Sequence, residues 1–176
     1  MIKYFTLLIA LAMPALGFAQ TKASMYVEPE FSMHKVHTPG MGSFSLNGVG
    51  VALGKVVLPN LALEALVGKG TSEDTQSLAG FPVTLKGGTS YGVYARPFIA
   101  VNDKLELFAR LGYVSGEGTA TVFGVSTTDT TEDFSYGVGV AFKVKENIAI
   151  VGNYTLYSDK GGTKADGFGV GVRFGF

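Results

Sequence analysis

The chain of 176 residues contains no cysteine and no tryptophan, and only 16% of its residues are charged. Without cysteine, the chain can form no disulfide framework and carry out no thiolate chemistry. Its 14 basic and 14 acidic residues cancel, so it has no basic excess that would favour nucleic acid as a partner. A soluble domain typically carries about 25% charged residues. The chain is therefore charge-poor, and its length predicts one domain.

The first residues differ from the rest of the chain. One positive charge, at Lys3, precedes an almost unbroken apolar run from Phe5 to Leu16. Gly17 and Ala19 then occupy the two positions that a signal peptidase reads. The run is shorter than the ~20 residues that a spanning helix needs, which disfavours a membrane anchor. We therefore expect a signal peptide at 1–19 and a single domain at 20–176.

After this segment the chain has no further run of 18 apolar residues, but it alternates in polarity. Every second residue from Leu105 to Tyr113 is apolar, and Glu106 and Arg110 lie on the opposite parity. Successive side chains on a strand point to opposite faces of a sheet. The same alternation occurs in eight segments, near residues 25–33, 49–54, 61–68, 91–96, 105–113, 134–143, 148–157 and 167–176. These segments predict eight strands with one apolar face each.

The connections between these strands alternate in length. Short turns are expected at 58–60, 101–104 and 144–147, and longer polar loops at 34–44, 70–88, 115–133 and 158–164. Short periplasmic turns and longer outer loops are typical of outer-membrane barrels, in which closure leaves no backbone group unpaired in lipid. We therefore expect an all-β fold, an eight-stranded antiparallel up-and-down transmembrane β-barrel in the bacterial outer membrane, present as a monomer.

A soluble barrel of the lipocalin kind is the competing interpretation. Such a barrel would place its apolar residues inside and its charges outside. Here the less apolar face is rich in Gly, Ala and Ser, which suits a crowded lumen better than a solvated exterior. Side chains fill the interior of an eight-stranded barrel almost completely.

Two segments carry a resemblance to a known family. These are Ser135-Tyr136-Gly137-Val138-Gly139-Val140, before a short turn, and the alternating final strand that ends at Phe176. The chain resembles the small eight-stranded outer-membrane barrels of the OmpA and OmpX type. The resemblance implies that the barrel assembly machinery reads the last strand, with Phe176 as the assembly signal. It indicates architecture but no activity, because that group includes structural and adhesive members.

Several charged residues are expected to face the lumen. They are Glu28, Glu30, Lys55, Glu64, Arg96, Glu106, Arg110, Lys143 and Arg173. Charges in so narrow a space must be paired. We therefore predict an ion-pair network that fills the barrel. The alternative is a selectivity or gating element in a narrow conductive path.

The two histidines, His34 and His37, have no third metal ligand nearby in the sequence. Ser32, Ser43 and Ser45 lie near them, but nothing orders these residues into a catalytic triad. We therefore expect no metal, no cofactor and no enzymatic activity.

Pro29 falls inside the first predicted strand, where it would remove a ladder hydrogen bond. It predicts either a bulge or a strand that begins later.

Aromatic residues near the predicted strand ends fit the two girdles of a membrane barrel. They are Tyr91, Tyr113, Phe134, Tyr136, Tyr154 and Phe168 at the outer end, and Phe142, Phe174 and Phe176 at the inner end. The partners expected on this basis are membrane lipid and, at the loops, lipopolysaccharide or another surface. The expected role is structural or one of surface interaction, and the alternative is a narrow porin-like channel.

Overall fold

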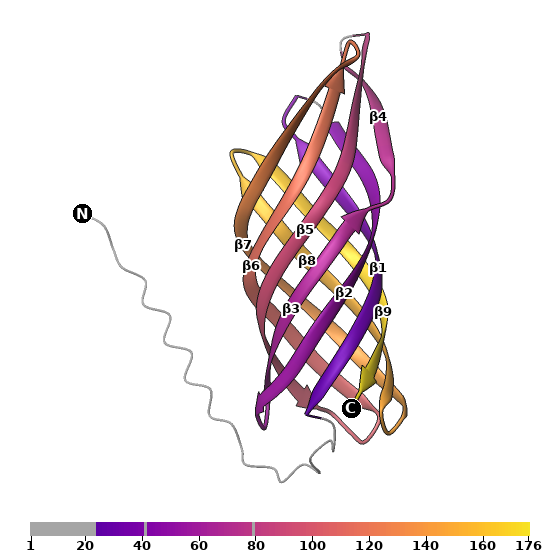
Figure 1. Ribbon diagram of the computed structural model, residues 1–176, viewed down its shortest axis with the longest axis vertical. Coiled ribbons are helices and arrows are strands. Elements are labelled where there is room, and N and C mark those ends of the chain that lie inside the picture. Colours follow the sequence, from indigo (N-terminus) through magenta and orange to yellow (C-terminus); the bar gives the residue numbers. More distant parts are fainter. Residues whose placement is uncertain (1–23, 41, 79) are drawn as a thin grey trace, which may run out of the picture.

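The computed structural model describes residues 24–40, 42–78 and 80–176, which form an antiparallel β-structure (Figure 1). The predicted signal peptide lies outside these residues. The strands are β1 (Met25–Thr38), β2 (Gly42–Leu58), β3 (Leu61–Gly70), β4 (Glu73–Leu78), β5 (Phe81–Ala100), β6 (Leu105–Val122), β7 (Val125–Lys145), β8 (Ile148–Lys160) and β9 (Thr163–Gly175). Within the described part of the chain, no helix is long and apolar enough to cross a membrane.

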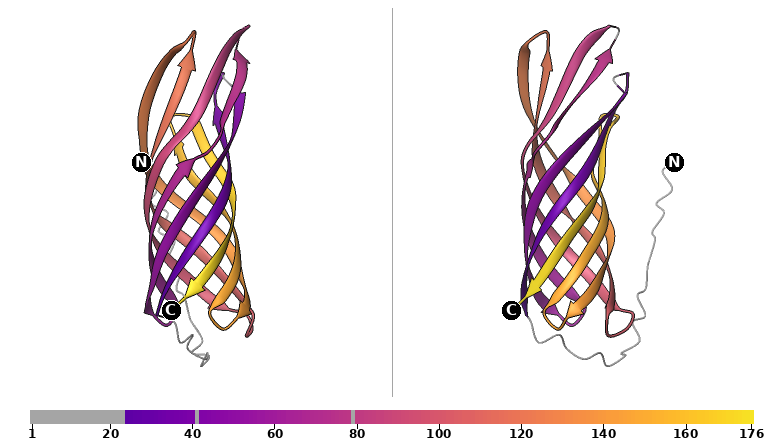
Figure 2. Two further views of the ribbon diagram at one scale, coloured as in Figure 1. Left: turned by 45° about the vertical axis from the view of Figure 1, so that its right-hand side comes forward. Right: turned by 90° about the vertical axis from the view of Figure 1, so that its right-hand side faces the viewer.

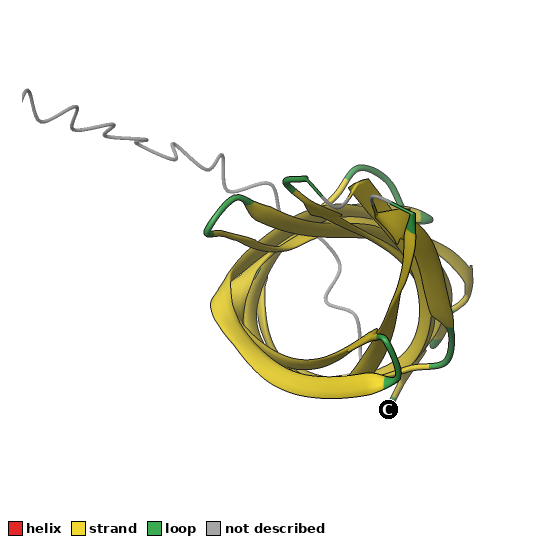
Figure 3. Ribbon diagram, turned by 90° about the horizontal axis from the view of Figure 1, so that it is seen from above, coloured by secondary structure: helices red, strands yellow, loops and turns green. Residues whose placement is uncertain are grey.

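The strands close into a ring, as the view along the barrel shows (Figure 3). Pairing runs in the order β3-β2-β1-β9-β8-β7-β6-β5, and an additional β3–β5 pairing completes the circle. β4 continues β3 after a break at Thr71 and Ser72 and pairs with the outer half of β5. The predicted eight-stranded barrel is therefore confirmed, with its third strand divided in two.

The alternation predicted from the sequence matches the burial pattern along the strands. On β2, Val49, Val51 and Leu53 are exposed on the outer face, whereas Ala52 and Gly54 are buried inside. Some inward glycines leave room for the aromatic ring of the residue that faces them on the neighbouring strand. A Cβ at Gly54 would meet the ring of Tyr26, and a Cβ at Gly139 would meet the ring of Phe108.

The four long polar loops expected from the sequence are mostly strand, so that expectation was wrong. The residues 115–133 belong to a hairpin of β6 and β7 that is paired out to Val122 and Val125. Threonine has a high strand propensity, and pairs of hydroxyl side chains stabilise facing strands. Such pairs join Thr119 to Thr128 and Thr121 to Ser126. The β4–β5 and β6–β7 hairpins reach farther beyond the barrel than the other two (Figure 2).

Pro29 lies within β1, which begins at Met25 and has no bulge. Pairing with β9 is interrupted at Glu28 and Pro29 and resumes at Glu30 in the same register. Proline has no N–H to donate, which accounts for the interruption. Both explanations offered by the sequence, a bulge or a later start, were therefore wrong.

The β6–β7 turn has an unusual backbone. Phe123 has φ 53° and Gly124 has φ 76°, and Phe123 is the one non-glycine residue with a positive φ in the described part of the chain. Two-residue hairpin turns of this hand favour Asn-Gly or Asp-Gly. A side chain with a Cβ in this conformation costs about 1–2 kcal/mol. The turn therefore keeps a phenylalanine at a position where the local backbone disfavours it.

We predict that Gly139→Val destabilises the barrel. The new Cβ would collide with the Phe108 ring and with the carbonyl oxygen of Gly152. Overpacking of this kind costs about 1–3 kcal/mol, measurable by urea unfolding of the detergent-solubilised barrel. Gly152→Val is the matched control, because a Cβ there meets nothing within 4 Å. Equal stability of the two variants would contradict the close packing described here.

Candidate functional site in the barrel lumen

The lower half of the lumen is crossed by charged side chains from five strands. Glu28 and Glu30 come from β1, Glu64 from β3 and Arg96 from β5. Glu106 and Arg110 come from β6, and Arg173 from β9. Each lies on the inward parity of its strand. Arg96 is 1% exposed and Glu28 is fully buried.

Three arginines and three glutamates form a closed ring of alternating charge, which we call the ion-pair ring. Arg110 contacts Glu28 at 2.7 Å, and Glu28 contacts Arg173 at 2.9 Å. Arg173 contacts Glu106 at 2.9 Å, and Glu106 contacts Arg96 at 3.3 Å. Arg96 lies 3.5 Å from Glu64, and Glu64 closes the ring to Arg110 at 2.7 Å. Every member therefore has two neighbours of opposite charge.

Two aromatic side chains lie against this ring. The guanidinium carbon of Arg96 is 3.7 Å from the ring centroid of Phe108, and those of Arg110 and Arg173 are 5.6 and 5.9 Å from it. Tyr26 donates a hydrogen bond to Glu64 at 2.6 Å and accepts one from Arg96. Cation–π contact of this kind stabilises a buried guanidinium. The aromatic faces thus complete the environment of the arginines.

The sequence prediction did not single out Phe108 and Tyr26 as members of this site. A signal for both was present, because Phe108 lies two residues from both Glu106 and Arg110 and Tyr26 lies two residues from Glu28. Positions two apart on a strand share a face. Phe108 also packs with Ala141, Ala149 and Val151, so small residues of the neighbouring strands β7 and β8 line the wall beside it.

Two lysines of the predicted set do not belong to the ion-pair ring. Lys55 is exposed beside Leu63 of β3, on the outer face that it shares with Leu53. The prediction that Lys55 faces the lumen was wrong. Lys55 is two residues from Leu53, and residues two apart on a strand point to the same face. Lys143 is half-buried and makes none of the ion pairs found among the described residues.

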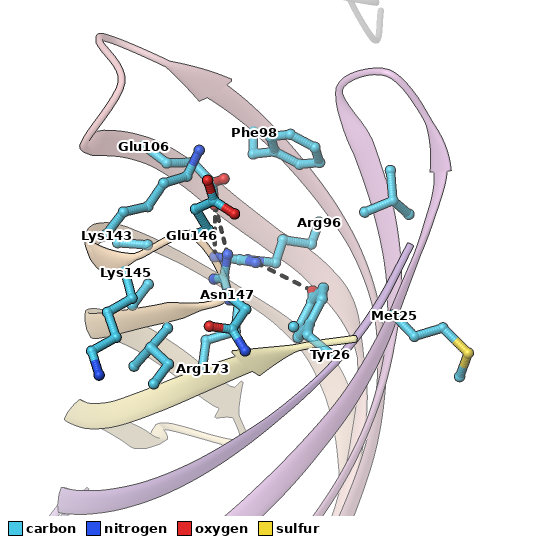
Figure 4. A pocket seen from close by; sticks show the side chains of 15 residues that line it. Met25, Tyr26, Arg96, Phe98, Glu106, Lys143, Lys145, Glu146, Asn147 and Arg173 are labelled. Carbon is cyan, nitrogen blue, oxygen red and sulfur yellow. Dashed lines mark hydrogen bonds and ion pairs between the residues drawn. The ribbon is translucent and has the colours of Figure 1, made fainter. Parts of the chain in front are cut away.

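Lys143 lines a small cavity at the periplasmic mouth together with Glu106, Arg96 and Arg173 (Figure 4). The cavity has a volume of about 60 Å³. Glu30 gives the cluster a fourth carboxylate, through a 3.3 Å contact with Arg110. Four carboxylates then face three guanidinium groups, which leaves a formal charge of −1. The ammonium group of Lys143 at the mouth offsets this charge.

Hydrogen-bonded polar residues fill the lumen above the ion-pair ring. Asn153 donates to Glu30 and accepts from Thr155, and Tyr94 donates to Ser135 at 3.1 Å. Ser135 in turn donates a hydrogen bond to the backbone carbonyl oxygen of Leu156. Buried polar groups are tolerated when they are paired in this way. The lumen therefore contains a hydrogen-bonded polar layer stacked on the ion-pair ring, and among the described residues only Arg96 Nε and Arg173 Nη2 are buried side-chain atoms without a hydrogen-bond partner.

The two histidines each meet one serine. His34 Nε2 is 2.7 Å from Ser32 Oγ inside the barrel, and His37 Nδ1 is 3.0 Å from Ser43 Oγ on the exposed outer hairpin. No hydrogen bond from either histidine ring to a carboxylate is found among the described residues, so neither pair forms a Ser-His-acid triad. Across residues 24–40, 42–78 and 80–176, no group of three His, Asp or Glu could hold a metal ion.

Two aspartates join the outer hairpins to the barrel wall. Asp74 of β4 accepts a hydrogen bond from the backbone N–H of Ser45 on β2 at 2.8 Å. Asp133 of β7 accepts from the backbone N–H of Asp159 and from the hydroxyl of Ser158 on β8. These bonds replace ladder pairing where β4 and β7 leave their neighbours. Both lie outside the membrane-spanning part, and these hydrogen bonds hold the pKa of each carboxyl below its usual value.

Comparison with known proteins fits this geometry. Residues 4–176 match the family model described as outer membrane protein beta-barrel domain. The chain belongs to this family. Its location is accordingly the bacterial outer membrane, as predicted, and the exposed face of the strands meets lipid. Among curated proteins, the sequence comparison finds no match.

Solved structures with this fold include surface proteins of several bacteria. Ail, the attachment invasion locus protein of Yersinia pestis, is 16% identical, with a TM-score of 0.65 over 88% of this chain and 99% of that chain. Neisserial surface protein A is 14% identical, with a TM-score of 0.66 over 88% and 98%. The N-terminal barrel of Pseudomonas aeruginosa OprF is 16% identical, with a TM-score of 0.57 over 85% and 97%. At these identities the likeness establishes the fold, and the family consists of outer-membrane barrels.

We predict that Arg110→Met strongly destabilises the barrel. It would remove the partner of three carboxylates, and breaking a buried ion pair costs about 3–5 kcal/mol. The midpoint of urea unfolding, followed by the heat-modifiable gel shift, measures the loss. Lys55→Met is the control, because Lys55 lies exposed on the outer face. If both variants unfolded at the same urea concentration, the ion-pair ring would not be a stabilising element.

We predict that acid loosens the junction of β4 with β2. The carboxylate form of Asp74 is favoured in the folded hairpin, so its contribution is present above the ordinary aspartate pKa of about 3.9. That contribution is lost as the pH falls through the lower pKa of the folded state. The amide proton of Ser45, followed by NMR in detergent, should therefore titrate with a midpoint below that ordinary value. In Asp74→Asn the titration should be absent, and its persistence would assign it to another group.

Proposed function

We propose that this protein is a closed outer-membrane scaffold whose role is structural or one of surface interaction, rather than transport or catalysis. The observation that carries the proposal is the ion-pair ring. Its six members link β1, β3, β5, β6 and β9 across the lumen. Phe108 and the small residues of β7 and β8 occupy the remaining wall. A lumen filled in this way leaves the outer hairpins as the part available to partners.

The outer hairpins support the interaction role. β7 is paired with β6 from Val125 to Phe142 but with β8 only from Tyr136 onward, so its outer part extends beyond the wall. Binding residues are often carried by loops on a rigid scaffold. Among proteins of similar fold, Ail is named for attachment and invasion and has been solved in complex with a heparin analogue. These facts concern Ail, and they make a surface role a reasonable expectation here.

Lipopolysaccharide is a proposed partner of the outer belt. Lys35 on β1 and Lys164 on β9 are exposed on the outer parity of adjacent strands, near the top of the barrel wall. Ammonium groups at this level can meet lipid phosphates. The protein is further proposed to be a monomer, with Phe176 as the residue read by the barrel assembly machinery. Phe176 is exposed, and its backbone pairs with Met25 beside the β1–β9 seam.

A narrow channel is the second candidate. The cavity at the periplasmic mouth favours it, because Arg96, Lys143 and Arg173 line an opening that could admit small ions. A conductive path would need to continue past the ion-pair ring, where side chains of opposite charge lie within 2.7–3.5 Å of one another.

Single-channel recording in planar bilayers separates the two candidates. We expect the folded barrel, checked by its heat-modifiable gel mobility, to give no stable conductance at neutral pH. A porin inserted into the same bilayer serves as the positive control. A stable conductance from this barrel would overturn the closed-scaffold proposal and establish the channel.

A further inference from the structure

Apolar side chains meet at the farthest points of the molecule. Phe81 begins β5 next to the β4–β5 turn, and Phe123 lies in the β6–β7 turn. Their rings stack edge to face with centroids 4.9 Å apart, and they are 50% and 69% exposed. Val125, the first residue of β7, is 69% exposed. We call Phe81, Phe123 and Val125 the apolar tip.

The apolar tip lies above the lipid belt, so contact with the barrel's own membrane does not explain its exposure. These hairpins rise above the other two (Figure 2). Phe123 also keeps a left-handed backbone in a turn that asparagine would fit better. Strain retained at an exposed position is a pointer to function rather than to folding.

The hairpins carry no charge near this tip. Residues 75–85 and 118–128 contain no Asp, Glu, Lys or Arg. Five strand residues on either side of a turn span roughly 16 Å. That length exceeds the roughly 5–10 Å by which interfacial segments enter a bilayer surface. If the partner were a pocket on a protein, only the residues next to the two aromatic rings would need to lack charge. A lipid bilayer disfavours charged residues along the whole length of hairpin that enters it.

The first charges below the uncharged zone are mostly acidic. Glu73, Asp74, Glu117 and Asp129 outnumber the single Lys86. An anionic membrane would repel this band, whereas zwitterionic headgroups would not. Charge complementarity therefore favours a neutral lipid surface.

We propose that the apolar tip inserts into an apposed lipid bilayer with zwitterionic headgroups, different from the membrane that holds the barrel. This inference rests on the surface-interaction role proposed above and names its partner. The rings of Phe81 and Phe123 enter the headgroup boundary, and the threonine-rich flanks of the β6–β7 hairpin contact the headgroups. Each contact is weak, but many copies of the protein on one cell would bind the apposed bilayer together and so hold the cell to it firmly.

The chain has no tryptophan, so Phe123→Trp creates a single fluorescent reporter at the tip. The experiment uses the full mature barrel held in an amphipathic polymer. On addition of phosphatidylcholine vesicles, we expect the emission of this variant to shift to the blue. Phosphatidylglycerol vesicles should give a much smaller shift. Thr130→Trp, placed below the uncharged zone, is the control and should not shift.

A second variant tests the aromatic side chains directly. Phe81→Ser combined with Phe123→Asn should lower co-sedimentation with phosphatidylcholine vesicles by roughly tenfold, because the variant lacks the two aromatic rings that would be buried in the bilayer. Asparagine suits the turn, and unchanged heat-modifiable mobility would show that the barrel still folds.

Three outcomes would overturn the inference: no blue shift at position 123 with phosphatidylcholine, or one no larger than with phosphatidylglycerol; an equal shift at position 130; or unchanged sedimentation of the double variant. Absence of vesicle binding would point to a protein as the partner of the tip. The closed-scaffold proposal would then still stand on its silent conductance, so the two failures are distinguishable.

Discussion

The structure depends on the ion-pair ring that closes on itself across the lumen. A buried charge is costly unless it is fully paired. Here the ring gives each of its three arginines and three glutamates two partners. Because these partners come from strands on different sides of the barrel, the ring fixes the cross-section. A ring of this kind narrows the lumen at its level, which is the basis of the closed-scaffold proposal.

The ring also explains why the rest of the lumen is built from small residues. Phe108 and Tyr26 need space next to the guanidinium groups, and glycines at 139 and 54 provide it. On the neighbouring strands β7 and β8, Ala141, Ala149 and Val151 pack against Phe108, whose ring centroid lies 3.7 Å from the guanidinium carbon of Arg96. The high glycine content of the chain is therefore partly a packing requirement of one charged layer.

The alternation of the sequence predicted the faces of the strands well. Parity alone placed Arg96, Arg110 and Glu106 inside, and it would also have placed Lys55 outside had it been applied there. It could not predict which charges meet, because contacts across a barrel depend on strand tilt and stagger, which no local pattern contains. The outer hairpins were taken for loops because threonine and serine are polar. Their strand pairing continues nonetheless, as the Thr119–Thr128 pair shows.

The outer hairpins are paired and anchored structures, and this determines what they can do. Asp74 and Asp133 tie the departing edges of β4 and β7 back to β2 and β8 at the points where the ladders end. Above these anchors, β6 pairs without interruption with β7, and β5 pairs with β6 on both sides of a register shift between Gly87 and Ser90, which holds the turns at a fixed height. A flexible loop would fold exposed phenylalanine rings back onto its own chain, since apolar surface is buried wherever the chain allows it. Rigid hairpins prevent that collapse. Phe81 and Phe123 can therefore bury apolar surface only against each other and against an external partner of the apolar tip.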